Sequence, residues 1–204
     1  LAQLPATGTP VFGVGHSLGG TLMAMAAAKA PERFRGVVML DPPLMLGTDA
    51  LAMKAAKRFG FIDRITPAGK TLGRRTVWPG REAMAMYLRR RGLFRRFTPE
   101  ALNDYIEAGT RLLDDGRAEL TFDPTIEVAI FRHLPDHLTR LPKRLEVPVS
   151  IVAGEASDLL TARRIKRLER HGLQVDKVPG SHMFPMEHPD EARLAILAAW
   201  QRLT

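Results

Sequence analysis

The sequence predicts an α/β fold: a mostly parallel sheet with flanking helices, and a helical lid insertion between its second and third strands. The first observation is a set of apolar segments typical of buried strands, at residues 10–14, 34–43, 147–154 and 173–178. The second is that helix-forming segments separate paired strands, as in the right-handed crossovers of parallel sheets. The third is that residues 44–144 contain no convincing strand pattern.

The most informative motif lies between the first strand and the first helix. Residues 15–20 read Gly-His-Ser-Leu-Gly-Gly, and the alanine-rich helix that follows stops at Pro31. A serine at a sharp strand-to-helix turn needs small neighbours two residues before and two after it. We therefore expect the turn to require Gly15 and Gly19, and Gly20 to let the helix approach the strand.

This turn makes Ser17 the candidate nucleophile. The first amides of the following helix point their free N–H groups at the same spot, so the N–H of Leu18 is the candidate oxyanion donor. A hydroxyl in this position still needs a base, and the base needs an orienting acid. The alternative is a glycine-rich turn without chemistry.

The remaining helices are predicted from amphipathic spacing, capping residues and glycine or proline stops. Within the insertion they cover residues 49–60, 79–92, 98–113 and 124–131. After it, helices at 161–171 and 189–203 flank the last strand. The predicted organisation is a core formed by residues 1–43 and 145–204, with a lid (cap) at 44–144. Lids control access and substrate selectivity.

With this strand–turn–helix context, the chain resembles α/β-hydrolase-fold serine hydrolases of the lidded esterase and lipase kind. The resemblance covers residues 9–38 and, more strongly, 147–200. It implies a triad in the chain order serine, acid, histidine, and hydrolysis of carboxylic esters through an acyl-enzyme. In that family several strands precede the nucleophile strand, and one of them carries the loop with the second oxyanion donor. We therefore expect this chain to lack those N-terminal strands and that donor.

The resemblance implies that His182 is the base. It lies in the segment Pro179–Pro189, directly after the last strand, and this segment is similar to the family's histidine loop. A loop there lies over the carboxyl end of the sheet, as Ser17 does. The alternative is a loop imidazole bonded to the backbone.

Asp158 is the expected acid, because the family usually places its aspartate in the loop after the third of these strands. It lies 24 residues before His182. Glu155 is the near rival, and Asp41, after the second strand, is the distant one, since some relatives carry the acid there. Asp158 could instead cap the helix that starts near Thr161.

Three further residues are expected at the substrate pocket: His16 beside the nucleophile, and Met183 and Phe184 in the histidine loop. Because methionine adapts to irregular ligands, Met183, Phe184 and the lid methionines would suit an apolar acyl group. The alternative is that they belong to the core.

Neither a metal nor an organic cofactor is expected, since triad chemistry requires none. His133 and His137 have the spacing of a metal pair, but Pro135 breaks the helix that this spacing needs. The chain has no cysteine, which excludes disulfides, a thiolate nucleophile and cysteine metal sites and is compatible with the cytoplasm, where we expect the protein. No apolar run approaches the length of a transmembrane helix.

The basic charge is concentrated in the insertion. The net charge is +8, and residues 54–96 hold thirteen Lys and Arg against only Asp63 and Glu82. The ordinary interpretation is a solvated lid face. The functional one is attraction to anionic lipid surfaces or acidic substrates. No motif supports nucleic-acid binding.

The sequence thus predicts a serine esterase with a small-molecule substrate. The same triad would serve a thioesterase, a C–C bond hydrolase, a cofactor-free haloperoxidase or an acyltransferase. Relatives with an aspartate nucleophile are disfavoured by the serine at the elbow. Outside the enzymes, the alternative is a non-catalytic basic interaction module.

Overall fold

The structure, a computed structural model, describes residues 8–203. The chain forms two compact units, each described here by itself. Residues 8–50 and 136–203 make the first unit and residues 51–135 make the second. The sequence predicts an insertion at residues 44–144, and the second unit, residues 51–135, is shorter than this range at both ends.

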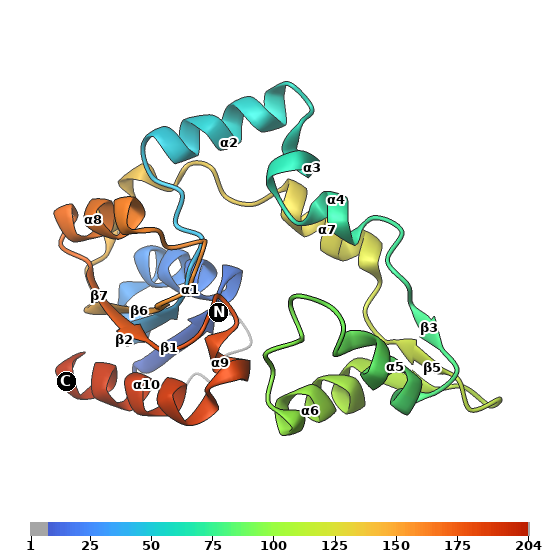
Figure 1. Cartoon of the computed structure of the whole chain (residues 1–204). Helices are drawn as coiled ribbons and strands as arrows, with labels where there is room; N and C mark the ends of the chain where they lie inside the picture. Colours follow the sequence, from blue (N-terminus) through green and yellow to red (C-terminus); the bar gives the residue numbers. More distant parts are fainter. Residues whose placement is uncertain (1–7, 204) are drawn as a thin grey trace. The chain divides into compact units, whose positions relative to one another are not determined.

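The first unit is built on a four-stranded parallel sheet in the order β1-β2-β6-β7 (Figure 1). This confirms the predicted α/β class. Because β1 and β6 both pair with β2, the carboxyl ends of these strands meet at one edge of the sheet. The strands are β1 (Val11–His16), β2 (Phe34–Leu40), β6 (Val149–Gly154) and β7 (Gln174–Val178).

Helices cover both faces of this sheet (Figure 1). On one face, α1 (Leu18–Lys29) and α8 (Ala162–Arg170) pack on a cluster that includes Val37, Met39 and Ile151. On the other, α10 (Pro189–Leu203) packs on a cluster that includes Val38, Leu40 and Val152. Alternate residues of β2 therefore fill two separate cores, as a strand buried on both faces requires. The short helices of this unit are η1 (Pro31–Arg33), η2 (Leu138–Arg140), η3 (Pro142–Arg144) and α9 (Phe184–Glu187).

The second unit is mostly helical and has its own small core. Trp78, Met84, Leu88, Leu102 and Ile106 form this core. Its helices are α3 (Ile62–Ile65), α4 (Ala68–Thr71), α5 (Arg81–Leu88), α6 (Pro99–Gly109) and α7 (Pro124–Arg132), and α2 (Thr48–Arg58) begins in the first unit and continues into it.

The second unit also contains a three-stranded antiparallel sheet that the sequence pattern missed. Its order is β3 (Val77–Trp78), β5 (Ala118–Leu120), β4 (Thr110–Leu112). Strands of two or three residues are too short to show an alternating pattern. The expected helix at 98–113 is wrong at its end for the same reason, because α6 stops at Gly109 and the chain continues into β4. Within residues 8–203, no helix is long and apolar enough to cross a membrane.

Candidate active site

Ser17 lies at the turn between β1 and α1, in a backbone conformation that few residues adopt. Its φ is 53° and its ψ is −128°, a sparsely populated region for a residue with a side chain. Its N–H donates to the carbonyl of Leu40 at 2.8 Å, which ties the turn to the end of β2. The amide of Leu18 is the first of α1, so it has no acceptor within that helix, whereas the amides of Gly20 and Thr21 donate to the carbonyl of Ser17.

Two glycines are needed for this turn, although not the two that the spacing suggested. A Cβ on Gly15 would lie 2.5 Å from the carbonyl carbon and oxygen of Gly19, and one on Gly20 would lie 2.6 Å from the carbonyl oxygen of Gly15. A Cβ on Gly19 would meet nothing within 4 Å. The close approach of helix and strand therefore requires Gly15 and Gly20, and the expected steric need for Gly19 is wrong.

The structure brings Ser17 together with His182. The hydroxyl Oγ of Ser17 lies 3.0 Å from Nε2 of His182. The other ring nitrogen, Nδ1, lies 2.7 Å from Oδ2 of Asp41. A carboxylate accepts, so Nδ1 carries the hydrogen, and Nε2 is left free to accept the serine proton. This is the geometry of a nucleophile, a general base and an orienting acid.

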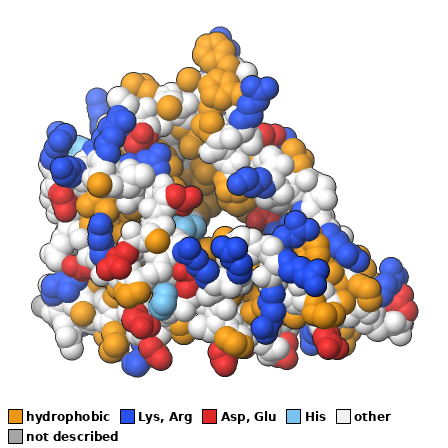
Figure 2. All heavy atoms as spheres, viewed as in Figure 1, with side chains coloured by type: hydrophobic (Ala, Val, Ile, Leu, Met, Phe, Trp, Pro, Cys, Tyr) orange, Lys and Arg blue, Asp and Glu red, His pale blue; other side chains and the backbone are white. Residues whose placement is uncertain are grey.

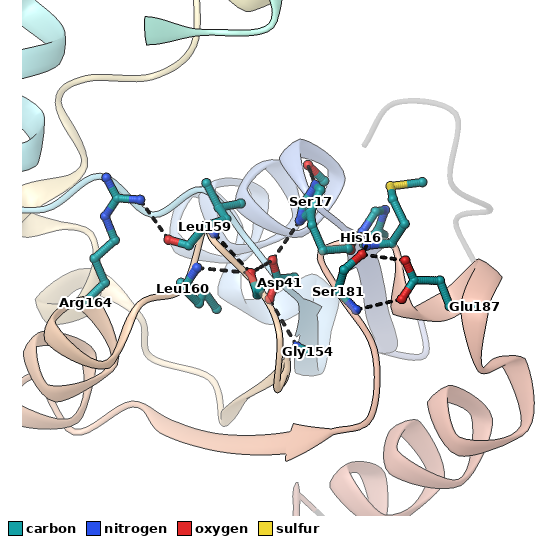
Figure 3. Close-up of polar contacts among 12 residues, drawn as sticks. His16, Ser17, Asp41, Gly154, Leu159, Leu160, Arg164, Ser181 and Glu187 are labelled. Carbon is teal, nitrogen blue, oxygen red and sulfur yellow. Dashed lines mark hydrogen bonds and ion pairs between the residues drawn. The ribbon is translucent and has the colours of Figure 1, made fainter. Parts of the chain in front are cut away.

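The acid beside the histidine is Asp41, and the expectation that Asp158 holds this place is wrong. Asp41 follows β2, has a φ of 45° and is fully buried. Figure 3 shows it between Ser17 and Gly154. Asp158 and Glu155 are both exposed, and no hydrogen bond among the described residues joins either side chain to His182. Nor does Asp158 cap α8, whose N-cap residue is Thr161.

The loop that was expected to supply the acid supports Asp41 instead. Ser157 Oγ donates to Oδ2 of Asp41 at 2.6 Å, and the N–H of Gly154 donates to Oδ1 at 3.2 Å. The strand order explains this, since β2 lies between β1 and β6 and its end is nearer the elbow. Two loops thus converge on one carboxylate, and no spacing along the sequence indicates which loop provides it.

His16, expected at the substrate pocket, contacts His182. Its Nε2 lies 2.8 Å from the backbone carbonyl of His182, and the two rings pack with centroids 4.8 Å apart. A carbonyl only accepts, so Nε2 of His16 carries the hydrogen. Burial lowers the pKa of His16, and the nearby His182 ring lowers it further, against the opposing effects of this hydrogen bond and of Asp41. The lowered pKa of His16 favours the neutral form of its ring.

Glu187 is a site residue that sequence reasoning missed. Its side chain is buried, and it accepts from the N–H of Ser181 at 2.7 Å and from the hydroxyl of Ser181 at 2.5 Å. Figure 3 shows Ser181 and Glu187 facing each other on the far side of Ser17 from the Asp41 loop. This pair fixes the residue directly before His182. A glutamate five residues after a candidate base gives no local signal of this role.

The two expected substrate contacts in the histidine loop differ from each other. Phe184 is fully buried in the core on the α10 side of the sheet, so it offers no surface to a substrate and that expectation is wrong. Met183 is half-buried, and its contact with substrate remains a prediction. Among residues 8–203, no group of three His, Cys, Asp or Glu side chains is arranged to hold a metal ion.

Comparison with known proteins gives a family-level match. The model of the alpha/beta hydrolase family matches residues 1–193. A 2-(acetamidomethylene)succinate hydrolase of Mesorhizobium japonicum is 29% identical over 183 residues, which are 89% of this chain and 60% of that protein. A type I acyl-CoA thioesterase of Penicillium roqueforti is 33% identical over 94 residues, which are 46% of this chain and 20% of that protein.

A solved structure has a similar fold. The crystal structure of E-2-(acetamidomethylene)succinate hydrolase superposes with a TM-score of 0.75 at 27% identity, covering 96% of this chain and 68% of that one. The chain therefore spans a fifth of the length of the thioesterase and 60% of the length of the curated hydrolase.

Proposed function

Because this chain belongs to the alpha/beta hydrolase family, we propose that it is a serine hydrolase that cleaves carboxylic esters, with Ser17 as nucleophile, His182 as base and Asp41 as acid. The observation that carries the proposal is the connected pair of contacts, 3.0 Å from Ser17 Oγ to His182 Nε2 and 2.7 Å from His182 Nδ1 to Asp41 Oδ2.

In the proposed reaction, Ser17 Oγ attacks the carbonyl carbon of the ester while Nε2 of His182 takes the hydroxyl proton. Asp41 stays ionised and stabilises the imidazolium that forms. The N–H of Leu18 donates to the developing oxyanion, where the first-turn amides of α1 favour negative charge. His182 then returns the proton to the leaving alcohol, and water hydrolyses the acyl-enzyme by the same steps in reverse.

The proposed substrate is a small molecule with an apolar acyl group. Met183, half-buried beside the base, is the residue expected to contact it. The second unit, residues 51–135, is proposed as the lid that governs access. A thioester is the second candidate substrate, since the Penicillium relative is named an acyl-CoA thioesterase.

The proposal includes attraction of the second unit to anionic lipid surfaces. Arg89, Arg90, Arg91, Arg95 and Arg96 are all exposed in the segment between α5 and α6. Figure 2 shows Lys and Arg side chains gathered over this segment. Basic residues near an anionic membrane surface contribute about 1 kcal/mol each to binding.

A fluorophosphonate probe tests the central proposal. We expect the protein to be labelled at Ser17, located by peptide mass spectrometry, and to hydrolyse p-nitrophenyl esters. Ser17→Ala should lose both labelling and turnover, while Ser157→Thr, which keeps the neighbouring hydroxyl, should retain them. Turnover that survives in Ser17→Ala would contradict the proposed nucleophile. Comparing p-nitrophenyl butyrate with butyryl-CoA then distinguishes an ester substrate from a thioester.

A further inference from the structure

The buried carboxylate of Asp41 is held by neutral hydrogen-bond donors. It accepts from the N–H of Gly154, from Ser157 Oγ and from Nδ1 of His182. Among the described residues, no Lys or Arg pairs with it, and its side chain is fully buried. A buried charge is costly unless hydrogen bonds replace the lost water. Every donor to this carboxylate therefore matters to its charge and its orientation.

The hydrogen bond from Ser157 is the shortest of these contacts. The groups around Ser157 Oγ fix the direction of its hydroxyl hydrogen. The hydroxyl oxygen accepts from the N–H of Leu159 at 3.1 Å and from the N–H of Leu160 at 3.2 Å. A hydroxyl has two acceptor lone pairs and one hydrogen. Because both lone pairs face amides, the hydrogen is directed to Oδ2 of Asp41, 2.6 Å away.

The turn that carries Ser157 is itself anchored. The N–H of Ser157 donates to the carbonyl of Gly154 at 3.0 Å, and Arg164 of α8 donates to the carbonyl of Leu159 at 2.7 Å. Figure 3 shows Leu159, Leu160 and Arg164 on the side of Asp41 opposite Ser181. Amides that donate to a hydroxyl polarise it and strengthen the bond that it donates. The loop after β6 is thus built to present one hydroxyl to one carboxylate oxygen.

We propose that Ser157 is a positioning residue of the active site, whose hydroxyl stabilises the charge of Asp41 and holds Oδ2 toward Nδ1 of His182. This inference rests on the proposed function, because it assigns a role within the same triad. Among the described residues, the hydrogen bonds of Ser157 Oγ go to Asp41, Leu159 and Leu160, and none goes to Ser17. It acts through Asp41, by keeping the imidazole in the tautomer that can accept the proton of Ser17.

The test compares three changes at Ser157 with one at its exposed neighbour, in the full chain. Ser157→Ala and Ser157→Cys remove the strong donor, and Cys keeps the size of the side chain if the Ala variant does not fold. Hydrogen bonds to charged groups are strong enough that we expect kcat to fall about 10- to 100-fold. KM should change little, because binding is not affected. Ser157→Thr, which keeps the hydroxyl, should not show the loss of kcat seen in Ser157→Ala. Asp158→Asn should leave kcat unchanged.

A spectroscopic measurement separates this inference from the proposed function. In proton NMR, the Nδ1 hydrogen of His182 should give a downfield signal that weakens or shifts in Ser157→Ala but not in Ser157→Thr or Asp158→Asn. If Ser17 proves unreactive, the proposed function fails. The NMR signal of the Nδ1 hydrogen then decides by itself whether Ser157 positions Asp41 and His182. If Ser17 reacts while Ser157→Ala and Ser157→Cys keep normal kcat and an unchanged signal, the Ser157 inference is overturned and the proposed function stands. A loss of stability without a change in kcat would show that Ser157 only shapes the turn.

Discussion

At the scale of single residues, His182 is held by hydrogen bonds to its ring and to its backbone carbonyl. Oδ2 of Asp41 accepts from both Ser157 and His182, at 2.6 Å and 2.7 Å. The carbonyl of His182 accepts from the His16 ring at 2.8 Å. His182 is therefore held through both its backbone and its Nδ1 atom, which leaves Nε2 directed at Ser17.

The choice of acid gives the sharpest prediction at this scale. Asp41→Asn places an amide where a carboxylate is needed, so Nδ1 of His182 loses its hydrogen and Nε2 can no longer accept the serine proton. We expect kcat to fall by roughly 10⁴-fold, the size of effect that this change has in other triads. Asp158 is exposed and makes no hydrogen bond to His182 among the described residues, so Asp158→Asn should keep wild-type kcat. Steady-state hydrolysis of a p-nitrophenyl ester measures both, and the opposite pattern would return the acid to Asp158.

At the scale of elements, the loops after β1, β2, β6 and β7 meet at one edge of a parallel sheet. The histidine loop approaches β6 so closely that Gly154 has no room for a side chain. A Cβ there would collide with the backbone carbonyl oxygens of Gly180 and Ser181. Gly180, with a φ of 106°, makes the bend that brings Ser181 to Glu187. Besides His16 and Asp41, these two glycines and the buried Glu187 thus help to position His182.

Substituting Gly154 tests this close approach. Gly154→Ala should push the histidine loop away from β6, because two backbone groups cannot yield as a flexible side chain would. A misplacement of about 1 Å in such a site can cost roughly 100-fold in rate, and overpacking costs about 1–3 kcal/mol of stability. Gly92→Ala is the matched control, since a Cβ there meets nothing within 4 Å. Ester hydrolysis and urea unfolding of both variants give the measurement, and normal activity in Gly154→Ala would show that the loop can shift without moving His182.

At the scale of the whole molecule, the chain combines a sheet unit that holds the proposed triad with a basic, mostly helical unit. The net charge is +8. The exposed arginines between α5 and α6 make no ion pair within the described part of the chain, although Arg91 packs 4.3 Å above the ring of Tyr87. Charge that is not paired internally is free to act on a partner surface.

Vesicle binding tests the role of this charge. We expect co-sedimentation with vesicles that contain about 30% phosphatidylserine, weakening as salt rises from about 50 to about 300 mM. The triple variant Arg89→Gln, Arg90→Gln, Arg91→Gln should bind clearly less. A matched triple variant on α8, Arg163→Gln, Lys166→Gln, Arg170→Gln, removes the same charge from the first unit and should bind nearly as wild type. Equal loss in both variants would mean that net charge alone drives binding.

The sequence by itself determined what depends on local pattern. The strand–turn–helix around Ser17 and the parallel strands were predictable, because periodicity and turn glycines are properties of neighbouring residues. The choice of His182 came from the resemblance of its loop to the histidine loop of a known family. Short strands such as Val77–Trp78 were not, since two residues show no period. The burial of Phe184 was not predictable either, because it depends on which helix covers the histidine loop.

Only the tertiary structure decided which carboxylate faces the histidine. Asp41 and Asp158 follow two strands that pair in the sheet, and both are plausible by chain order. The order β1-β2-β6 places the end of β2 beside the elbow, and the backbone turn at Asp41 directs its side chain toward His182. Across that edge, the loop after β6 contributes a hydroxyl instead of a carboxylate. No short stretch of sequence determines strand order or a positive φ, and for this reason the acid could not be predicted from the sequence.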